Sequence, residues 1–296
     1  MFFILLSLCL FSLNAAAQQD DEVIKIDSSL VVLNATVTDA SGKPVFGLKN
    51  NQFTIFEDGK PQEISLFETE NAPFAAVILI DTSGSMEERV SLARSAAMRF
   101  LDGIRADDSV EIYNFDSKIS LVQEFSGSHD LVDSAYNLKA DGMTVLNDAI
   151  YKAAQDLSSR AEKRRAIIVL SDGADTSSKL SGDKALKAAL SANATIYTVD
   201  MSPVDTSASE ARERMQSQGA LKNFAEKSGG KFIATPGGAA MREAFKNIVE
   251  ELGTQYTLGY QPPAAAKDGK WHSIELKVNK QGAQVRARKG YNAPKK

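Results

Sequence analysis

The chain has 296 residues, of which 43% are hydrophobic and 24% charged, and its formal net charge is −4 at pH 7. These values are ordinary for a soluble globular protein of one or two domains, and they exclude a disordered chain, a multi-span membrane protein and an electrostatic nucleic-acid binder. The single cysteine, Cys9, and the two histidines, His129 and His272, exclude a disulfide framework, a cysteine-ligated zinc site, a catalytic thiol and a multi-histidine metal site.

The chain begins with a pattern typical of a secretory signal. Residues 2–13 read FFILLSLCLFSL, an apolar run too short to cross a bilayer as an ordinary helix. The small residues up to Ala17 predict cleavage there, so residues 1–17 are predicted to be a signal peptide. Because no lysine or arginine precedes the run, an uncleaved anchor is the alternative. Cleavage would leave a periplasmic or secreted protein without a transmembrane span.

Two segments, 22–70 and 254–296, have the alternation of half-buried β-strands. Neither is large enough to bury a comfortable core alone. We therefore expect them to form one sandwich-like β-domain, with Phe67 and Trp271 in its core, and two separate β pieces are the alternative. The alternating stretches are VIKI (23–26), SLVVLNATVT (29–38), QFTIF (52–56), EISLF (63–67), QYTLGY (255–260), WHSIELKVN (271–279) and AQVRAR (283–288).

The middle of the chain, residues 72–253, has a different pattern. Continuous apolar runs read as strands buried on both faces, which is the habit of parallel sheets. These runs are AAVILI (75–80), AIIVL (166–170) and TIYTV (195–199). Stretches with helical periodicity follow, beginning near Val90, Leu146 and Met241. The alternation predicts a doubly wound, mostly parallel α/β domain, inserted into or flanked by the β-domain.

Oxygen-bearing side chains follow two of these strands and open one helix. Asp81, Ser83 and Ser85 come at the end of the first strand, Asp172 follows the strand 166–170, and Thr144 precedes the helix near Leu146. Open α/β sheets bind ligands beyond the carboxyl ends of their strands. Two carboxylates and three hydroxyls suit a hard divalent cation such as Mg²⁺, with waters completing its shell.

Each of these residues also has an ordinary structural explanation. Ser83, Ser85 or Thr144 could cap a helix, and Asp172-Gly173 could be a simple turn. Asp141 adds a carboxylate near the site, or it only begins a turn. The hypothesis of a cation site depends on the conjunction of the motifs.

This conjunction resembles the von Willebrand factor type A domain. The motifs are Asp81-x-Ser83-x-Ser85, then Gly142-x-Thr144 followed by Leu146-x-Asp148-Ala-Ile, and Ser171-Asp172-Gly173, in that order. In the family such residues form a metal-ion-dependent adhesion site. The resemblance implies that Ser83, Ser85 and Thr144 reach the ion directly and that Asp81 and Asp172 act mainly through waters. It leaves Asp148 either just outside the ion's ligands or merely exposed on its helix.

Two details qualify this resemblance. Met143 stands where the family often has a second glycine, which affects the expected shape of that loop. The flanking segments, with Glu57-Asp58-Gly59, Tyr256-x-Leu-Gly-Tyr260 and Arg286-x-Arg288-x-Gly290-Tyr291, are similar to a group of secreted bacterial proteins of this kind, found especially in Acidobacteria. That group implies no particular biochemical activity.

The resemblance implies a binding function and not an enzyme. Mg²⁺, with Mn²⁺ or Ca²⁺ as alternatives, would be completed by an Asp or Glu carboxylate of a protein partner. A structural envelope module with an unused metal site and a Mg²⁺-dependent hydrolase or phosphatase are the alternatives. The residues favour neither enzyme: a haloacid-dehalogenase-type phosphatase needs Asp where Ser83 stands, and serine hydrolysis needs a base, for which His129 is poorly placed.

Overall fold

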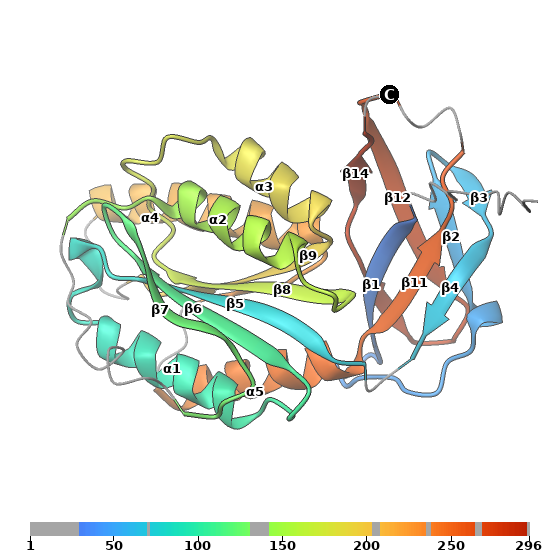
Figure 1. Cartoon of the computed structure of the whole chain (residues 1–296), viewed down its shortest axis with the longest axis horizontal. Coiled ribbons are helices and arrows are strands. Elements are labelled where there is room, and N and C mark those ends of the chain that lie inside the picture. The colour runs from blue at the N-terminus through green and yellow to red at the C-terminus, as the bar shows by residue number, and fades with distance from the viewer. Residues whose placement is uncertain are drawn as a thin grey trace, which may run out of the picture.

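The computed structural model describes residues 30–69, 72–130, 142–202, 208–234, 238–263 and 268–294. The predicted signal peptide, the predicted strand 23–26 and Asp141 lie outside the described residues. The described chain forms an α/β unit and a β unit, which lie side by side in Figure 1. Among the helices of the described residues, none combines the length and the apolar composition needed to span a membrane.

A mixed sheet forms the centre of the α/β unit. In the described part of the chain it has six strands in the order β10-β9-β8-β5-β6-β7, all parallel to their neighbours except the edge strand β7. Every residue of β5 is buried, which explains its continuous apolar run. The strands are β5 (Phe74–Asp81), β6 (Ser109–Phe115), β7 (Ile119–Ser126), β8 (Arg164–Ser171), β9 (Ala194–Asp200) and β10 (Phe232–Ile233).

Helices cover both faces of this sheet (Figure 1). One face carries α1 (Val90–Asp102) and α5 (Gly238–Thr254), and the other carries α2 (Leu146–Ser158), α3 (Gly182–Ser191) and α4 (Ala208–Ser228). Successive residues of β5 point to opposite faces, so Ile78 packs with α1 and α5 whereas Leu79 packs with α2 and α3. The predicted doubly wound, mostly parallel fold is confirmed.

The connections reverse the direction of winding between one pair of strand ends near the centre of the sheet. The chain leaves β5 toward α1 on one face and leaves β8 toward α3 on the opposite face. Since β5 and β8 are neighbours, the winding reverses between their carboxyl ends. This is the position at which open α/β sheets bind ligands. The β unit lies at the other end of the sheet, next to the start of β5 (Figure 1).

The β unit is built from both ends of the described chain. Two antiparallel sheets, with strand orders β13-β1-β11-β4 and β14-β12-β2-β3, enclose one hydrophobic core. In the first sheet β1 pairs with β11 and β13, and in the second β2 pairs with β12. The strands are β1 (Val31–Thr38), β2 (Phe53–Glu57), β3 (Lys60–Gln62), β4 (Ile64–Glu68), β11 (Tyr256–Tyr260), β12 (Trp271–Val278), β13 (Gln284–Arg286) and β14 (Gly290–Asn292). Short 3-10 turns span Asn50–Gln52 and Gly84–Met86.

A buried arginine joins the two units. Arg164, at the start of β8, is fully buried. Its Nε donates to Thr257 Oγ1 at 3.2 Å in β11, and its Nη2 donates to the carbonyl of Thr69 at 2.5 Å. The guanidinium also reaches the carbonyls of Ala72 and Gly253, so it holds both chain segments that connect the units.

We propose that residues 72–253 fold without the rest of the chain. The two cores of the α/β unit draw only on residues between Phe74 and Leu252, whereas the core of the β unit needs strands from both flanking segments. Residues 72–253 expressed alone should therefore unfold cooperatively in urea, and residues 22–70 alone should show no cooperative transition. A cooperative transition for residues 22–70 would contradict this division.

The expectation that Trp271 belongs to the core of the β unit is wrong. Trp271 is 45% exposed, because it occupies one of the alternate positions of β12 that face away from the core, while Ile274 occupies an inward one. Its ring instead covers Gly290 in the paired strand β14, where a Cβ atom would lie 2.4 Å from the indole. Phe67, by contrast, is partly buried and packs against the core.

Candidate functional site

Asp81 is the last residue of β5 and is fully buried. Its Oδ1 accepts hydrogen bonds from the backbone N–H of Ser83 at 2.9 Å and from Ser83 Oγ at 2.6 Å. Its Oδ2 accepts from Ser171 Oγ, at the end of β8, at 2.5 Å. Asp81 therefore ties together the ends of the two strands between which the winding reverses.

The turn after β5 carries two hydroxyl groups, of which one contacts this carboxylate. Ser83 is buried, Ser85 is exposed, and their Oγ atoms are 3.2 Å apart. Ser83 stands at the N-cap of the short 3-10 turn, but its side chain caps no backbone N–H. Because Ser83 Oγ donates its hydrogen to Asp81, Ser85 Oγ is the donor between the two serines, and one lone pair of Ser83 Oγ stays available to another ligand. The hydroxyl thus does not serve as a helix cap.

Thr144 lies in the loop that packs against this turn. The backbone N–H of Gly84 donates to the carbonyl of Gly142 at 3.2 Å, which holds the two loops together. Gly142 has a φ of +75°, and a Cβ atom there would lie 2.3 Å from Ser117 Oγ, so the position requires glycine. Ser117 Oγ in turn accepts from the backbone N–H of Met143. Thr144 itself is 3% exposed.

Asp172 follows β8 and completes the set of loops. It is partly exposed, and its Oδ1 accepts from the backbone N–H of Ala174 at 3.0 Å. The residues that follow Asp172 bind the backbone of Thr144. The N–H of Thr144 donates to Thr176 Oγ1 at 2.9 Å, and the carbonyl of Thr144 accepts from the N–H groups of Thr176 and Ser177. The structure thus brings the loops that carry Asp81, Thr144 and Asp172 to one edge of the sheet.

Asp148 is half-buried and not merely exposed on its helix, and its role just outside the ion's ligands stays a prediction. Its carboxylate accepts hydrogen bonds from the backbone N–H groups of Lys179 at 3.0 Å and Leu180 at 2.9 Å. It thereby fixes the loop that leads from Asp172 into α3. Asp148 thus supports the site by holding this loop in place. Asp141 lies outside the described residues.

Burial dominates the electrostatics of Asp81. It raises the pKa of this carboxyl to about 6, against the opposing hydrogen bonds from Ser171 and Ser83, and the negative charge of Asp172 raises the pKa further. The ionised carboxylate is therefore costly in the metal-free protein. A cation bound beside Asp81 would offset both the burial and the repulsion from Asp172.

The side chains gathered here fit a hard divalent cation. The donors are carboxylate and hydroxyl oxygens, which are the ligands that Mg²⁺ and Ca²⁺ prefer. The available lone pair of Ser83 and the raised pKa of Asp81 both favour a positive ligand at this edge. Ser83 contacts both Asp81 and Ser85, a backbone hydrogen bond attaches the Thr144 loop to this turn, and further backbone hydrogen bonds attach the Asp172 loop to Thr144.

The sequence analysis missed Ser171, which supports Asp81, and the buried carboxylate of Asp200 at the end of β9. Ser171 Oγ bonds Asp81 and also accepts from the N–H of Gly173, although Ser171 appeared in the motif only as a neighbour of Asp172. Asp200, the buried last residue of β9, accepts from the N–H of Ser202 and from Gln218 Nε2. The sequence contained a signal for Asp200, since this residue follows the apolar run 195–199 just as Asp81 follows the run 75–80.

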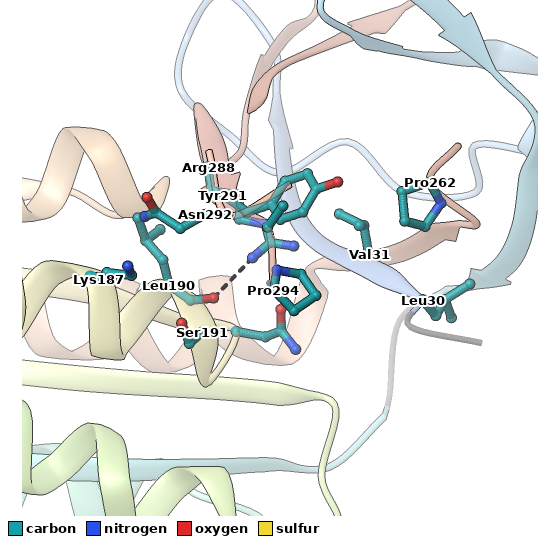
Figure 2. Close-up of a pocket in the computed structure, with 13 residues that line it drawn as sticks. Leu30, Val31, Lys187, Leu190, Ser191, Pro262, Arg288, Tyr291, Asn292 and Pro294 are labelled. Atoms are coloured by element: carbon teal, nitrogen blue, oxygen red, sulfur yellow. Dashed lines mark hydrogen bonds between the residues drawn. The ribbon is translucent and has the colours of Figure 1, made fainter. Parts of the chain in front are cut away.

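A separate cavity of about 470 Å³ lies where α3 meets the β unit (Figure 2). Arg288 lines it, is 8% exposed, and donates from Nη1 to the carbonyl of Leu190 at 3.0 Å. Burial lowers the pKa of Arg288 to about 10. Since Leu190 is near the end of α3, this cavity is at the opposite end of the sheet from Asp81 and contains none of the predicted site residues.

The family comparison agrees with the motifs. Residues 76–174 match the model of the von Willebrand factor type A domain, which confirms the resemblance to that family. A search of curated proteins finds no match. The narrower resemblance to a secreted bacterial group stays a prediction.

Three solved structures show what the fold is similar to. A von Willebrand factor type A protein from Catenulispora acidiphila is 12% identical, with a TM-score of 0.50 over 91% of this chain and 75% of that one. The vWF domain of the type V pili tip protein Mfa5 from Porphyromonas gingivalis is 14% identical, with a TM-score of 0.50 over 61% and 95%. An aerotolerance-related membrane protein from Bacteroides fragilis is 18% identical, with a TM-score of 0.45 over 60% and 98%.

Proposed function

We propose that this protein, in which residues 76–174 match the model of the von Willebrand factor type A domain, binds a protein partner. It does so through a bound divalent cation. Asp81, Ser83, Ser85, Thr144 and Asp172 would hold the ion. Mg²⁺ is the proposed ion, and Mn²⁺ or Ca²⁺ are the alternatives. An Asp or Glu carboxylate of the partner would complete its shell.

The observation that carries this proposal is the pairing of Asp81 with Ser83 at the switch point of the sheet. The Asp81 carboxylate accepts a hydrogen bond from the Ser83 hydroxyl, so the Ser83 oxygen can face an ion. The ion, when bound, supplies positive charge that neutral hydroxyl ligands leave largely uncompensated. A partner's carboxylate is attracted to that charge. The ends of the loops after β5 and β8, and the loop before α2, would then contact the partner around it.

The same geometry supports a binding function over catalysis. Ser83 Oγ is hydrogen bonded to a carboxylate and to Ser85, and within the described part of the chain no histidine contacts it. His129, the candidate base, is exposed in the bend after β7. We propose a non-enzymatic protein that acts in the periplasm or outside the cell, as the predicted signal peptide implies. The alternative is a structural envelope module in which the same residues hold no ion.

Capture from an envelope extract tests the proposal. Immobilised wild-type protein should retain partner proteins in Mg²⁺ and release them in EDTA, and Thr144→Ala should retain at least about tenfold less. Thr54→Ala, an exposed threonine of the β unit, is the matched control and should behave as wild type. Amidation of the extract's carboxyl groups should also abolish capture. Retention that is insensitive to EDTA, to Thr144→Ala and to amidation would contradict the proposal.

A further inference from the structure

A second group of potential metal ligands lies in the β unit, outside the von Willebrand factor type A domain. Glu57 ends β2, Asp58 begins the turn to β3, and His272 lies on the paired strand β12. One atom of each, a carboxylate oxygen or an imidazole nitrogen, falls within 4.8 Å of the corresponding atoms of the other two. The Nδ1 atom of His272 is 2.7 Å from Asp58 Oδ2 and 3.6 Å from Glu57 Oε1.

Each of these three side chains is held by its other polar atom. Glu57 Oε2 accepts from the hydroxyls of Tyr260 at 2.5 Å and Tyr291 at 3.3 Å. Asp58 Oδ1 accepts from both the N–H and the Oγ of Ser273. The Nε2 atom of His272 donates to Asp268 Oδ1 at 3.2 Å. The remaining atoms, Glu57 Oε1, Asp58 Oδ2 and His272 Nδ1, are the ones that lie close to one another.

Glu57 shows that the convergence is not an ordinary surface feature. Its side chain is 4% exposed, and among the residues that the structure describes its Oε1 accepts no hydrogen bond. This oxygen lies 3.6 Å from Nδ1 of His272, beyond hydrogen-bond distance. A metal ion that bound both atoms would link them.

The charge of the group also calls for a cation. Three carboxylates, from Glu57, Asp58 and Asp268, surround one imidazole. The ammonium of Lys270 approaches Asp268 at 3.8 Å, but its side chain is 80% exposed, so solvent screens most of its effect. A protonated His272 balances one of the three negative charges, and a divalent ion would balance two.

We propose that Glu57, Asp58 and His272 form a transition-metal site that takes Zn²⁺. A mixed set of one imidazole nitrogen and two carboxylate oxygens suits Zn²⁺ better than Mg²⁺, which prefers oxygen ligands alone. Ligands about 2.1 Å from a tetrahedral ion lie on the order of 3.4 Å apart, which is between the 2.7 Å and 3.6 Å that separate Nδ1 from Asp58 Oδ2 and from Glu57 Oε1. The ion would replace the proton between Nδ1 and Asp58, and Asp268 would orient the ring through its Nε2–H, as carboxylates do for zinc-bound histidines.

The site would connect two parts of the chain that are distant in sequence. Asp58 and His272 are 214 positions apart, and they belong to the two segments that together build the β unit. The sequence has a single cysteine, so no intramolecular disulfide can make this connection. A bound ion would hold the β2–β3 turn to β12 without one.

Co²⁺ binding to the untagged full chain tests the proposal. Co²⁺ replaces Zn²⁺ in such sites and gives a visible absorption band. We would titrate Co²⁺ in excess Mg²⁺, which occupies the oxygen-only site, in a Cys9→Ser background that removes the only thiol. One equivalent should produce the band, and Zn²⁺ should displace it. His272→Gln should weaken Co²⁺ affinity at least about tenfold, and Asp268→Asn, which changes a positioning residue, about 10- to 100-fold.

The controls separate this site from the rest of the molecule. His129→Gln removes the other histidine of the sequence and should leave the affinity unchanged, as should Asp81→Asn. Because His272→Gln could affect folding, Glu57→Gln is a second test: it preserves an acceptor for Tyr260 and should also weaken binding. Absence of the band, or equal affinity for the wild type and both site variants, would overturn the proposal.

Discussion

Replacing Asp81 with asparagine is expected to stabilise the metal-free protein by roughly 2 to 3 kcal/mol at pH 7.5. The folded-state pKa is raised from 3.8 to about 6, and each unit of pKa shift corresponds to about 1.4 kcal/mol. The shift therefore represents about 3 kcal/mol of cost for the ionised carboxylate. Asparagine has no charge and still offers an oxygen to Ser83, so most of this cost disappears.

The sign of the effect fixes its dependence on pH. Between pH 3.8 and about 6 the folded state holds a proton on Asp81 that the unfolded state has lost, so the stability of the wild type falls as the pH rises through this range. Above it the loss is constant. The advantage of Asp81→Asn should consequently be near zero at pH 4, grow up to about pH 6, and then level off.

Urea unfolding in EDTA at pH 4, 5, 6 and 7.5 measures this difference directly. Asp107→Asn is the control, because Asp107 is exposed and its replacement should change the unfolding free energy by less than about 0.5 kcal/mol at every pH. A variant that is less stable than the wild type at pH 7.5, by the same amount at all four values, would show that hydrogen bonding and not charge burial dominates at Asp81.

The addition of Mg²⁺ is expected to offset most of the advantage of Asp81→Asn over the wild type. An ion that binds only the folded state stabilises it by about 2.7 kcal/mol at a concentration 100 times its dissociation constant. For a chain of this size that corresponds to a rise in melting temperature of roughly 4 to 5 °C. The wild type should show the rise. Asp81→Asn should not, because it loses the negative charge, and Thr144→Ala should not, because it loses an oxygen ligand.

Melting curves over a series of Mg²⁺ concentrations check this expectation. His272→Gln is the matched control: it alters the group in the β unit and leaves the oxygen ligands of the α/β unit in place, so its melting temperature should rise as much as that of the wild type. Identical curves with and without millimolar Mg²⁺, in the wild type and in Asp81→Asn alike, would favour the structural module over the cation-dependent binding protein.

Strands that are fully buried were the easiest elements to predict from the sequence. The runs near β5, β8 and β9 are continuous and apolar because helices cover both faces of the sheet. The strand β6 was not predicted, since Glu111 and Asn114 interrupt its apolar pattern. Glu111 is nevertheless buried, and its burial raises its pKa to about 7. A polar residue inside the sheet therefore kept the sequence pattern from indicating this strand.

The sequence by itself determined the buried strands β5, β8 and β9, the helices α1, α2 and α5, and the positions of the oxygen-bearing residues at strand ends. Such features depend on local burial, which leaves a periodic trace in neighbouring residues. Only the tertiary structure decided that β1 pairs with β11 and β2 with β12, that Ser171 supports Asp81, and that Glu57, Asp58 and His272 converge. These contacts join residues about 90 to more than 200 positions apart, and no local pattern records which distant partner a residue meets.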